Sequence, residues 1–571
     1  MRRPLLLPLR IALVGVVCLA VQASTMLLTP LIWSGLALQS APASHPPGVK
    51  QNTGSTHAFR ELITSSGFSD SEGHRAAPGH EMLRRFRAGD ATAIAPRMFE
   101  QVYLRKPPGM PMAIALATAL LGPHEWAARS VSLISLAIGT MLSTWAAARW
   151  IGPRWALAAG LAHALLPVLW SPARSAEIES LHNLGVQVAC IALIELLRTR
   201  ERRSLLGGAS ALLAGACAAG GLFAAAWTKG PQAIPVVVGV LLASVFVFRP
   251  GAKQWGTAAG ALALGTGASL LALGWVWRVA SRAASEAGQA VVAQSPGEFL
   301  WDQSKLGAIA AFPLVALAAA LPLSLGITLP WGPDAQREDS LGSSTLAEES
   351  ESPREIRAHA KLCALGVACS LMIWLASGIH NPRYAMPAWF LLPPLVAYAA
   401  WGLQSGEAGF VSHRRKIVRV MFLGSPRIAL IVLLVGSLLH GVLTERSLME
   451  SSAREDGVLL ASSIDGDAIV FADHAIEARP ELLLSAEHTA SSNGRRLIGR
   501  WLPGLDLDAA RDEARRRGMP AFVLIRIDSG SDEPARVSGP VIWRGKAEAY
   551  EFGLVPLDVP ADSGASEPRP S

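Results

Sequence analysis

Long apolar runs alternate with short polar connections along most of the chain. Runs long enough to be candidate membrane spans occupy approximately 11–37, 126–148, 155–173, 180–197, 205–227, 232–248, 256–278, 308–331, 362–378, 385–402 and 428–444. A helix needs about 20 residues to cross a bilayer, and each run is close to that length. The pattern predicts an all-α polytopic membrane protein with about eleven transmembrane helices.

The charges between the apolar runs predict the orientation of the helices. With the N-terminus inside, the basic clusters 198–203 (RTRERR) and 412–415 (SHRR) also lie inside, where short loops carry an excess of Arg and Lys. Residues 38–108 and 445–571 then lie outside. The N-terminal segment could be a cleavable signal peptide, but its apolar character continues to about residue 38, which favours an uncleaved first span.

One apolar segment does not fit as a span. In the sequence YLRKPPG, Arg105 and Lys106 run into Pro107 and Pro108, which stop any helix arriving from upstream. About fourteen apolar residues follow, too few for a crossing. Counting them as a span would also place the cluster 198–203 outside. We therefore expect an outer-face juxtamembrane helix, with Lys106 at the height of the lipid headgroups.

The amino-acid composition is that of a membrane protein and argues against a soluble, nucleic-acid-binding or disulfide-rich protein. Of the 571 residues, 51% are hydrophobic and only 17% are charged, whereas soluble domains carry about 25% charged residues. The net charge of +7 falls in short clusters between apolar runs, which argues against a nucleic-acid partner. The five cysteines lie in apolar runs without a Cys-x-x-Cys pair, so neither a disulfide framework nor a thiolate metal site is indicated.

The chain divides into two predicted domains. Residues 1–444 form a transmembrane module, in which 38–108 is the first outer loop. Residues 445–571 contain strand-like runs (DAIVFADH, AFVLIRI) and a charged helical stretch (DLDAARDEARRRG), which predict a small outer α/β domain. The last dozen residues have the composition of a disordered tail.

Unusual polar residues from five separate segments all fall on the predicted outer side. They are Asp70, Glu72, Arg75, Tyr103, Arg105, Lys106, Glu177, Glu179, Lys229, Arg383 and Tyr384. Charged groups at membrane depth cost about 2.5–3.5 kcal/mol and usually have a function. Cations suit phosphate binding, and carboxylates suit proton abstraction or metal binding. The set predicts a polar cavity at the outer leaflet.

Each of these residues also has an ordinary structural explanation. Lys229 and Arg383 could be interface anchors at span ends. The acids Glu177 and Glu179 could belong to a solvated helix start, and Asp70 and Glu72 could cap a loop helix. His74 and Tyr103 are residue types that are more often structural than catalytic.

Six short motifs, taken in order, resemble the membrane-embedded GT-C glycosyltransferases. The likeness is to the branch of aminoarabinose–lipid A transferases and dolichyl-phosphate-mannose protein mannosyltransferases, and it covers about residues 1–445. The motifs are SEGHRA (71–76), YLRKPPG (103–109), Arg129 in WAARS, Glu179 in ARSAEIESL, TKGP (228–231) and RYAMP (383–387).

The resemblance implies a glycosyltransferase that takes a sugar from a polyprenyl-phosphate donor on the periplasmic or extracytoplasmic face of the cell inner membrane. The acceptor would be a lipid, a glycan or a protein. Glu72 matches the family's acidic position and is predicted to be the general base, with Asp70 as its rival and Glu179 as a further catalytic acid. The implied donor-phosphate ligands are Lys106, Lys229, Arg383, Arg75 and Arg105, and the implied substrate contacts are Tyr103, Tyr384 and Glu177.

The sequence departs from the family at several of these positions. Arg105 stands where the aminoarabinose branch has Glu, and the outer loop 280–306 contains no His. The metal ligands expected from that branch are therefore largely missing. A divalent metal held through Glu72 and Glu179 is left open, but no metal site is predicted.

Two other functions compete with a transferase. A multipass transporter for a lipid or an anionic solute would also place cations in a cavity, but it predicts internal pseudo-symmetry, which the sequence does not show. A catalytically inactive envelope scaffold is the second alternative, because the acidic positions have changed.

Overall fold

The computed structural model describes residues 7–23, 70–123, 125–198, 207–293, 352–375, 382–404, 454–527, 541–547 and 550–557, with scattered positions in 312–331, 431–443 and 537–540. Several sequence predictions lie wholly or largely outside these residues. They concern the basic cluster 198–203 beyond Arg198, the cluster 412–415, the first part of the outer loop (38–69) and the C-terminal tail, while the predicted spans 308–331 and 428–444 are described in part.

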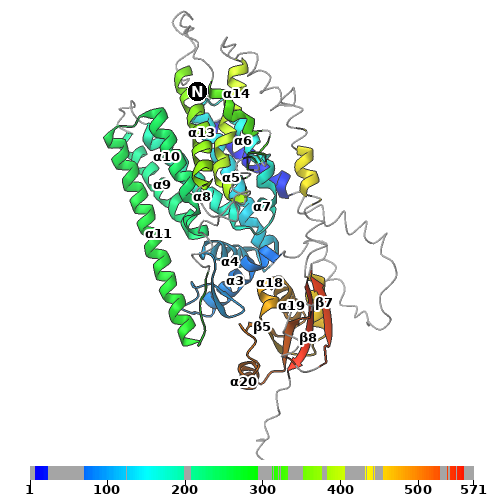
Figure 1. The fold of residues 1–571 in the computed structure, drawn as a ribbon. Helices are drawn as coiled ribbons and strands as arrows, with labels where there is room; N and C mark the ends of the chain where they lie inside the picture. The colour runs from blue at the N-terminus through cyan, green and yellow to red at the C-terminus, as the bar shows by residue number, and fades with distance from the viewer. Residues whose placement is uncertain are drawn as a thin grey trace, which may run out of the picture.

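Long apolar helices form a bundle in the upper part of Figure 1. They are α5 (Glu125–Trp150), α6 (Ala156–Ala164), α7 (Trp170–Arg174), α8 (Ile178–Arg198), α9 (Gly207–Lys229), α10 (Ile234–Phe248), α11 (Ala252–Glu286), α13 (Pro353–Leu375) and α14 (Leu392–Gln404). Short 3-10 helices lie between them: η1 (Pro167–Leu169), η2 (Gly230–Ala233), η5 (Leu323–Trp331) and η7 (Pro382–Leu391).

Within the described residues, 5 helical stretches are long and apolar enough to cross a membrane, or 6 if the bent pair Ala156–Ala164 and Pro167–Arg174 counts as one crossing. The chain is thus a multi-pass helical protein. The total of about eleven spans stays a prediction, since part of it rests on segments that are not described.

The two ends of the bundle can be followed along α8. At its start, Glu179 meets Lys229, the last residue of α9. Near its end, Glu195 accepts a hydrogen bond from the indole of Trp150, the last residue of α5, and Trp150 stacks on His359 of α13. We refer to these as the Glu179 end and the Glu195 end of the bundle.

Helices α9 and α10 run in opposite directions between these ends. α9 finishes at the Glu179 end, while Phe248 at the finish of α10 packs edge-on against His359 at the Glu195 end. Between them Gly230 has φ +74°, a left-handed conformation that costs other residues about 1–2 kcal/mol. The continuous helical stretch Ser210–Phe248 is therefore two antiparallel helices joined by a turn, which coincide with the separate apolar runs 205–227 and 232–248.

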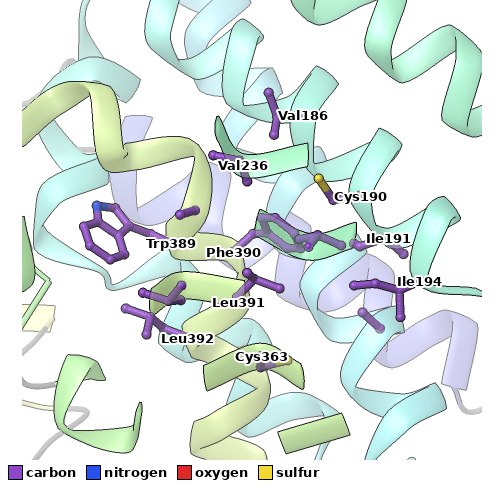
Figure 2. Packing of buried hydrophobic residues seen from close by; sticks show 14 of the residues in the cluster. Val186, Cys190, Ile191, Ile194, Val236, Cys363, Trp389, Phe390, Leu391 and Leu392 are labelled. Atoms are coloured by element: carbon purple, nitrogen blue, oxygen red, sulfur yellow. The ribbon is translucent and has the colours of Figure 1, made fainter. Parts of the chain in front are cut away.

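Figure 2 shows the apolar interior where α8, α10, α13, η7 and α14 meet. Val186 and Cys190 of α8 lie near Val236 of α10, with Leu391 and Cys363 on the facing elements. Glycine allows the closest approaches elsewhere in the bundle. A Cβ atom on Gly221 of α9 would lie 2.5 Å from the backbone nitrogen of Ala189 on α8. Small residues let membrane helices pack closely in this way.

The described part of the first outer loop lies below the bundle in Figure 1. It contains α3 (Asp70–Arg87), β1 (Arg97–Met98), β2 (Gln101–Leu104) and α4 (Gly109–Leu121). Helix α4 has 13 residues, short of a crossing, and follows Pro108, its N-cap residue. Leu116, Leu120 and Leu121 on this helix are exposed. The helix has the length and apolar surface expected of a juxtamembrane helix.

Helix α11 extends well beyond the other helices along one side of the molecule (Figure 1). Its 35 residues span about 52 Å, whereas the hydrocarbon core of a bilayer is about 30 Å thick. The last turns of α11 leave the bundle: Ala280, Ala283 and Ala284 pack against Ala95 and Val102 of the first outer loop. Strand β3 (Val292–Ala293) then pairs in parallel with β2.

The C-terminal part contains a five-stranded sheet of order β5-β4-β6-β8-β7. Its strands are β4 (Ala468–Ala472), β5 (Leu497–Trp501), β6 (Ala521–Arg526), β7 (Trp543–Ala547) and β8 (Tyr550–Leu557), and its helices are α17 (Arg454–Ser462), α18 (His474–Ala478), α19 (Pro480–Ser492) and α20 (Leu507–Arg517). Strands β5, β4 and β6 are parallel, while β8 and β7 are antiparallel additions. We call this the C-terminal unit. The assignment of 1–444 and 445–571 as separate domains stays a prediction.

The C-terminal unit packs directly on the first outer loop. The backbone N–H of Trp501, at the end of β5, donates to the carbonyl of Phe99 over 3.1 Å. A Cβ atom on Gly73 of α3 would lie 2.8 Å from the backbone nitrogen of Glu481 at the start of α19. Helix α3, which carries the acidic motif, is thus held between the bundle and the C-terminal unit.

Candidate functional site

One carboxylate and two cations meet at the Glu179 end of the bundle. The Nζ of Lys229 lies 2.9 Å from Oε1 of Glu179, and the Nε of Arg383 lies 3.8 Å from the same oxygen. The side chains of Glu179 and Lys229 are almost fully buried, whereas that of Arg383 is 47% exposed. Lys229 also lies over the ring of Tyr384, 4.4 Å from its centroid. The group carries a net positive charge and opens toward solvent at Arg383.

Local sequence explains why Glu179 and Lys229 can face each other. Glu179 lies in the first turn of α8 and Lys229 in the last turn of α9. A helix dipole favours an acid at its start and a cation at its end. Because α8 and α9 are antiparallel and in close contact through glycine, these two termini coincide. The TKGP motif then turns the chain away at Gly230.

The sequence-predicted base, Glu72, has a different environment. Its two carboxylate oxygens each accept a hydrogen bond from the guanidinium of Arg129, both over 2.8 Å, and Oε1 also accepts from the backbone N–H of Ala176 over 2.8 Å. Glu72 is 0% exposed and Arg129 is 3% exposed. In this structure the Glu72 carboxylate joins α3 to the start of α5 and to the segment before α8. Its assignment as the base stays a prediction.

A cavity of about 310 Å³ lies between α3, the elbow after β2 and the start of α8. It is lined by His74, Arg75, Pro96, Tyr103, Arg105, Lys106, Pro111 and Ile178. The hydroxyl of Tyr103 is 3.2 Å from Nδ1 of His74, and the two rings stack with centroids 6.0 Å apart. None of the eight lining residues is a carboxylate.

The cavity adjoins the Glu179 group. Arg75, on the cavity wall, lies 3.8 Å from Oε2 of Glu177. Ile178, which also lines the cavity, stands between Glu177 and Glu179 in the first residues leading into α8. A molecule bound at Glu179, Lys229 and Arg383 would therefore have the cavity next to it. The combined site has a buried cationic part and a wider polar part.

The elbow residues divide between the cavity and the C-terminal unit. Lys106 lines the cavity, and its position at the height of the lipid headgroups stays a prediction. Arg105 also lines it, but its guanidinium pairs with the carboxylate of Glu477 on α18. Nothing in the sequence indicates this partner, because the two residues lie 372 positions apart.

Most of the sequence-predicted site residues come together in this region, and some do not. Glu179, Lys229, Arg383 and Tyr384 form one connected group. Glu177, two residues before Glu179, pairs with Arg75 on the cavity wall. Glu72 lies apart from the cavity lining. Asp70 is the first residue of α3, and its side chain lies outside the described residues.

The possible metal ligands are already engaged with cations. Glu72 pairs with Arg129, and Glu179 pairs with Lys229. Among the described residues, no group of three or more His, Cys, Asp or Glu side chains could hold a metal ion. These two carboxylates therefore do not fit the divalent metal that the family resemblance left open.

No protein-family model and no curated protein matches this sequence. Comparison with solved structures gives a clear result. ArnT from Cupriavidus metallidurans in the apo state superposes with a TM-score of 0.57 at 16% identity, covering 86% of this chain and 94% of ArnT. The chain has the fold of the GT-C protein ArnT.

A second ArnT structure, bound to undecaprenyl phosphate, gives a TM-score of 0.55 with the same identity and coverage. The archaeal oligosaccharyltransferase AglB from Archaeoglobus fulgidus aligns with a TM-score of 0.39 at 10% identity, over 92% of this chain and 70% of AglB, too low to support a conclusion. The ArnT likeness extends over 86% of this chain, and together with the apolar helices it indicates a multi-pass membrane protein.

Proposed function

We propose that this chain is a glycosyltransferase that moves a sugar from a polyprenyl-phosphate-linked donor to an acceptor hydroxyl on the outer face of the membrane, with inversion. The observation that carries the proposal is the Glu179 group, in which two cations share one carboxylate beside a cavity. The ArnT fold, seen in one structure with undecaprenyl phosphate bound, supports the class of donor. The acceptor is a lipid, a glycan or a protein.

The leaving group of such a donor is a phosphate, which needs charge neutralisation rather than a proton. Lys229 and Arg383 supply two positive charges against the single negative charge of Glu179. A phosphate oxygen bound here would complete the charge balance of a largely buried group. The phosphate would reach Lys229 and Glu179 from the exposed side of Arg383. The lipid tail would then lie along the bundle, and the sugar would extend toward the cavity.

Inverting transfer also needs a group that takes the proton of the acceptor hydroxyl. The sequence assigns this role to Glu72. For this role the ion pair with Arg129 would have to open, because the Glu72 carboxylate has to leave Arg129 before it can accept a proton. The Glu72 assignment is tested below together with an alternative.

Arg383→Ala is the sharpest test of phosphate binding. It removes a half-exposed cation while leaving Glu179 paired with Lys229, so the fold is spared. Loss of a charged hydrogen bond costs roughly 1.5–3 kcal/mol. Binding of undecaprenyl phosphate to the purified protein in nanodiscs should therefore weaken about ten- to hundredfold. Arg149→Ala is the matched control, because it removes a half-exposed cation paired with Glu195 at the opposite end of the bundle.

The outcomes separate the proposal from its rivals. Undecaprenyl phosphate that binds the wild-type protein and both variants equally would remove the Glu179 group as the phosphate site. A transporter would bind the lipid phosphate but would not release it from defined undecaprenyl-phosphate sugars in the presence of an acceptor. An inactive scaffold would show no release with any donor.

A further inference from the structure

The proposed transfer needs a proton acceptor that is already at the cavity. Glu72 is fully buried in its ion pair with Arg129, and none of the described residues that line the cavity is a carboxylate. Glu179 is held by Lys229. Among the eight lining residues, Arg75, Arg105 and Lys106 are cations, which donate hydrogen bonds and do not accept them. Within the described part of the lining, His74 is the residue with a neutral nitrogen that can accept a proton.

We infer that His74, oriented by Tyr103, accepts the proton of the acceptor hydroxyl in the reaction proposed above. The inference rests on the proposed function and assigns its catalytic base. It takes the place of Glu72 in the mechanism, and Glu72 becomes a positioning residue that fixes α3, the helix on which His74 lies.

The geometry of the His74–Tyr103 pair fits this role. The Nδ1 of His74 lies 3.2 Å from the Tyr103 hydroxyl, and the stacked rings restrict the imidazole's orientation. We assign Nδ1–H as the donor and the Tyr103 oxygen as the acceptor, which leaves Nε2 as the basic nitrogen. A second group that fixes the tautomer is the usual way in which a protein prepares a histidine base.

The position of His74 relative to the phosphate site also fits. Arg75, the next residue, reaches Glu177, two residues before Glu179. Tyr103 is placed by β2, which pairs with β1 and with β3. Its ring lies 6.0 Å from that of Trp501 of the C-terminal unit. The pair therefore rests on a framework formed by three parts of the chain.

The chemical step balances without a further reactant. The acceptor hydroxyl oxygen forms a bond to C1 of the sugar while its proton moves to Nε2 of His74. The bond between C1 and the phosphate oxygen breaks, and its electron pair goes to the phosphate, where Lys229 and Arg383 neutralise the charge. The imidazolium then returns its proton to water.

The test compares His74→Ala with the wild-type protein and with His80→Ala, all full-length in nanodiscs. Turnover is the acceptor-dependent release of undecaprenyl phosphate from a panel of undecaprenyl-phosphate hexoses and pentoses, with the wild-type protein used to choose the donor. We expect kcat of His74→Ala to fall about 10²- to 10⁴-fold, with undecaprenyl phosphate binding retained. Added imidazole should restore part of the rate, because the cavity has room for it. Tyr103→Phe should lower kcat less, by about tenfold, the value of one hydrogen bond.

His80→Ala is the matched control, since His80 is on the same helix but stacks on His488 away from the cavity. It should keep its rate and should not respond to imidazole. Full turnover by His74→Ala, or a loss that imidazole does not restore, would overturn the assignment of His74 and leave the proposed function standing. Absence of turnover by the wild-type protein with every donor would overturn the proposed function and the assignment with it.

Discussion

Glu72 and Arg129 form a buried ion pair in which both carboxylate oxygens and two guanidinium nitrogens are used. Removing one partner of such a pair leaves an uncompensated charge, which costs about 3–5 kcal/mol. We therefore predict that Glu72→Gln lowers the midpoint of thermal unfolding clearly, measured by tryptophan fluorescence in detergent. The double variant Glu72→Met/Arg129→Met should recover most of the loss, because neither charge is then left alone.

An unchanged midpoint in Glu72→Gln, combined with lost turnover, would mean that Glu72 is a catalytic base after all. The comparison therefore separates a structural carboxylate from a catalytic one. It also shows why a sequence motif is not sufficient. The match of SEGHRA to an acidic motif selects α3 as the candidate helix, but the partner of Glu72 depends on how α3 packs against α5.

The meeting of Lys229, Glu179 and Arg383 could be predicted from their positions in the sequence. Lys229, Glu179 and Arg383 all lie at ends of apolar runs, and the charges in the connecting loops predict that these ends share one side. Their contact in the structure agrees with that prediction. The pairing of Arg105 with Glu477 could not be predicted, because it depends on how the C-terminal unit is placed.

At the level of elements, the contact between α8 and α9 decides whether Lys229 reaches Glu179. Gly221 has no room for a side chain, since a Cβ atom would lie 2.5 Å from the nitrogen of Ala189. We predict that Gly221→Ala pushes the two helices apart and weakens both thermal stability and undecaprenyl phosphate binding. Gly215→Ala, on the same helix with nothing within 4 Å of its Cβ position, should have neither effect. Equal behaviour of the two variants would show that the glycine contact does not set the geometry.

The apolar pattern predicts helices well where their length is decisive. It separated α9 from α10 and recognised that α4 is too short to cross. It could not predict that residues 155–173 form two helices, α6 and α7, bent by 53° around η1. Such a bend depends on packing in the bundle, which hydrophobicity does not encode.

At the scale of the whole molecule, two carboxyl groups lie near the contact between α3 and the C-terminal unit, the buried Glu81 and the partly buried Glu487. Burial raises the pKa of Glu487 to about 7, against the opposing effect of a hydrogen bond from the N–H of Gly499, and burial also raises the pKa of Glu81. An unfolded glutamate titrates near pH 4.3. The folded protein therefore retains a proton between about pH 4.5 and 7 that the unfolded chain loses, so stability falls as the pH rises through this range.

We predict that Glu487→Gln removes much of this pH dependence. The variant should unfold at a higher temperature than the wild-type protein at pH 8, and the difference should shrink toward pH 5. Thermal unfolding measured from pH 5 to 8 checks the prediction. Parallel curves for the two proteins would show that Glu487 does not titrate in this window. The unfolding temperature of Glu487→Gln should still fall somewhat as the pH rises, because Glu81 is unchanged in this variant.

The orientation of the bundle is also testable on the whole molecule. In a background without native cysteines, Gly251→Cys lies beyond the Glu195 end, and Ser462→Cys lies in the C-terminal unit. We predict that a membrane-impermeant maleimide labels Ser462→Cys from the outside and Gly251→Cys only after the membrane is opened. Labelling of both from the same side would contradict the predicted topology.

The length of α11 has a consequence for the membrane in which the protein works. A rigid helix of about 52 Å that packs against the first outer loop at one end cannot change its tilt without moving that loop. Tilt is the usual response of a long helix to a bilayer of different hydrophobic thickness. Strand β2 belongs to that loop: its Val102 packs on α11, and the next residue, Tyr103, lines the cavity. Turnover should therefore vary with the acyl chain length of the surrounding lipid.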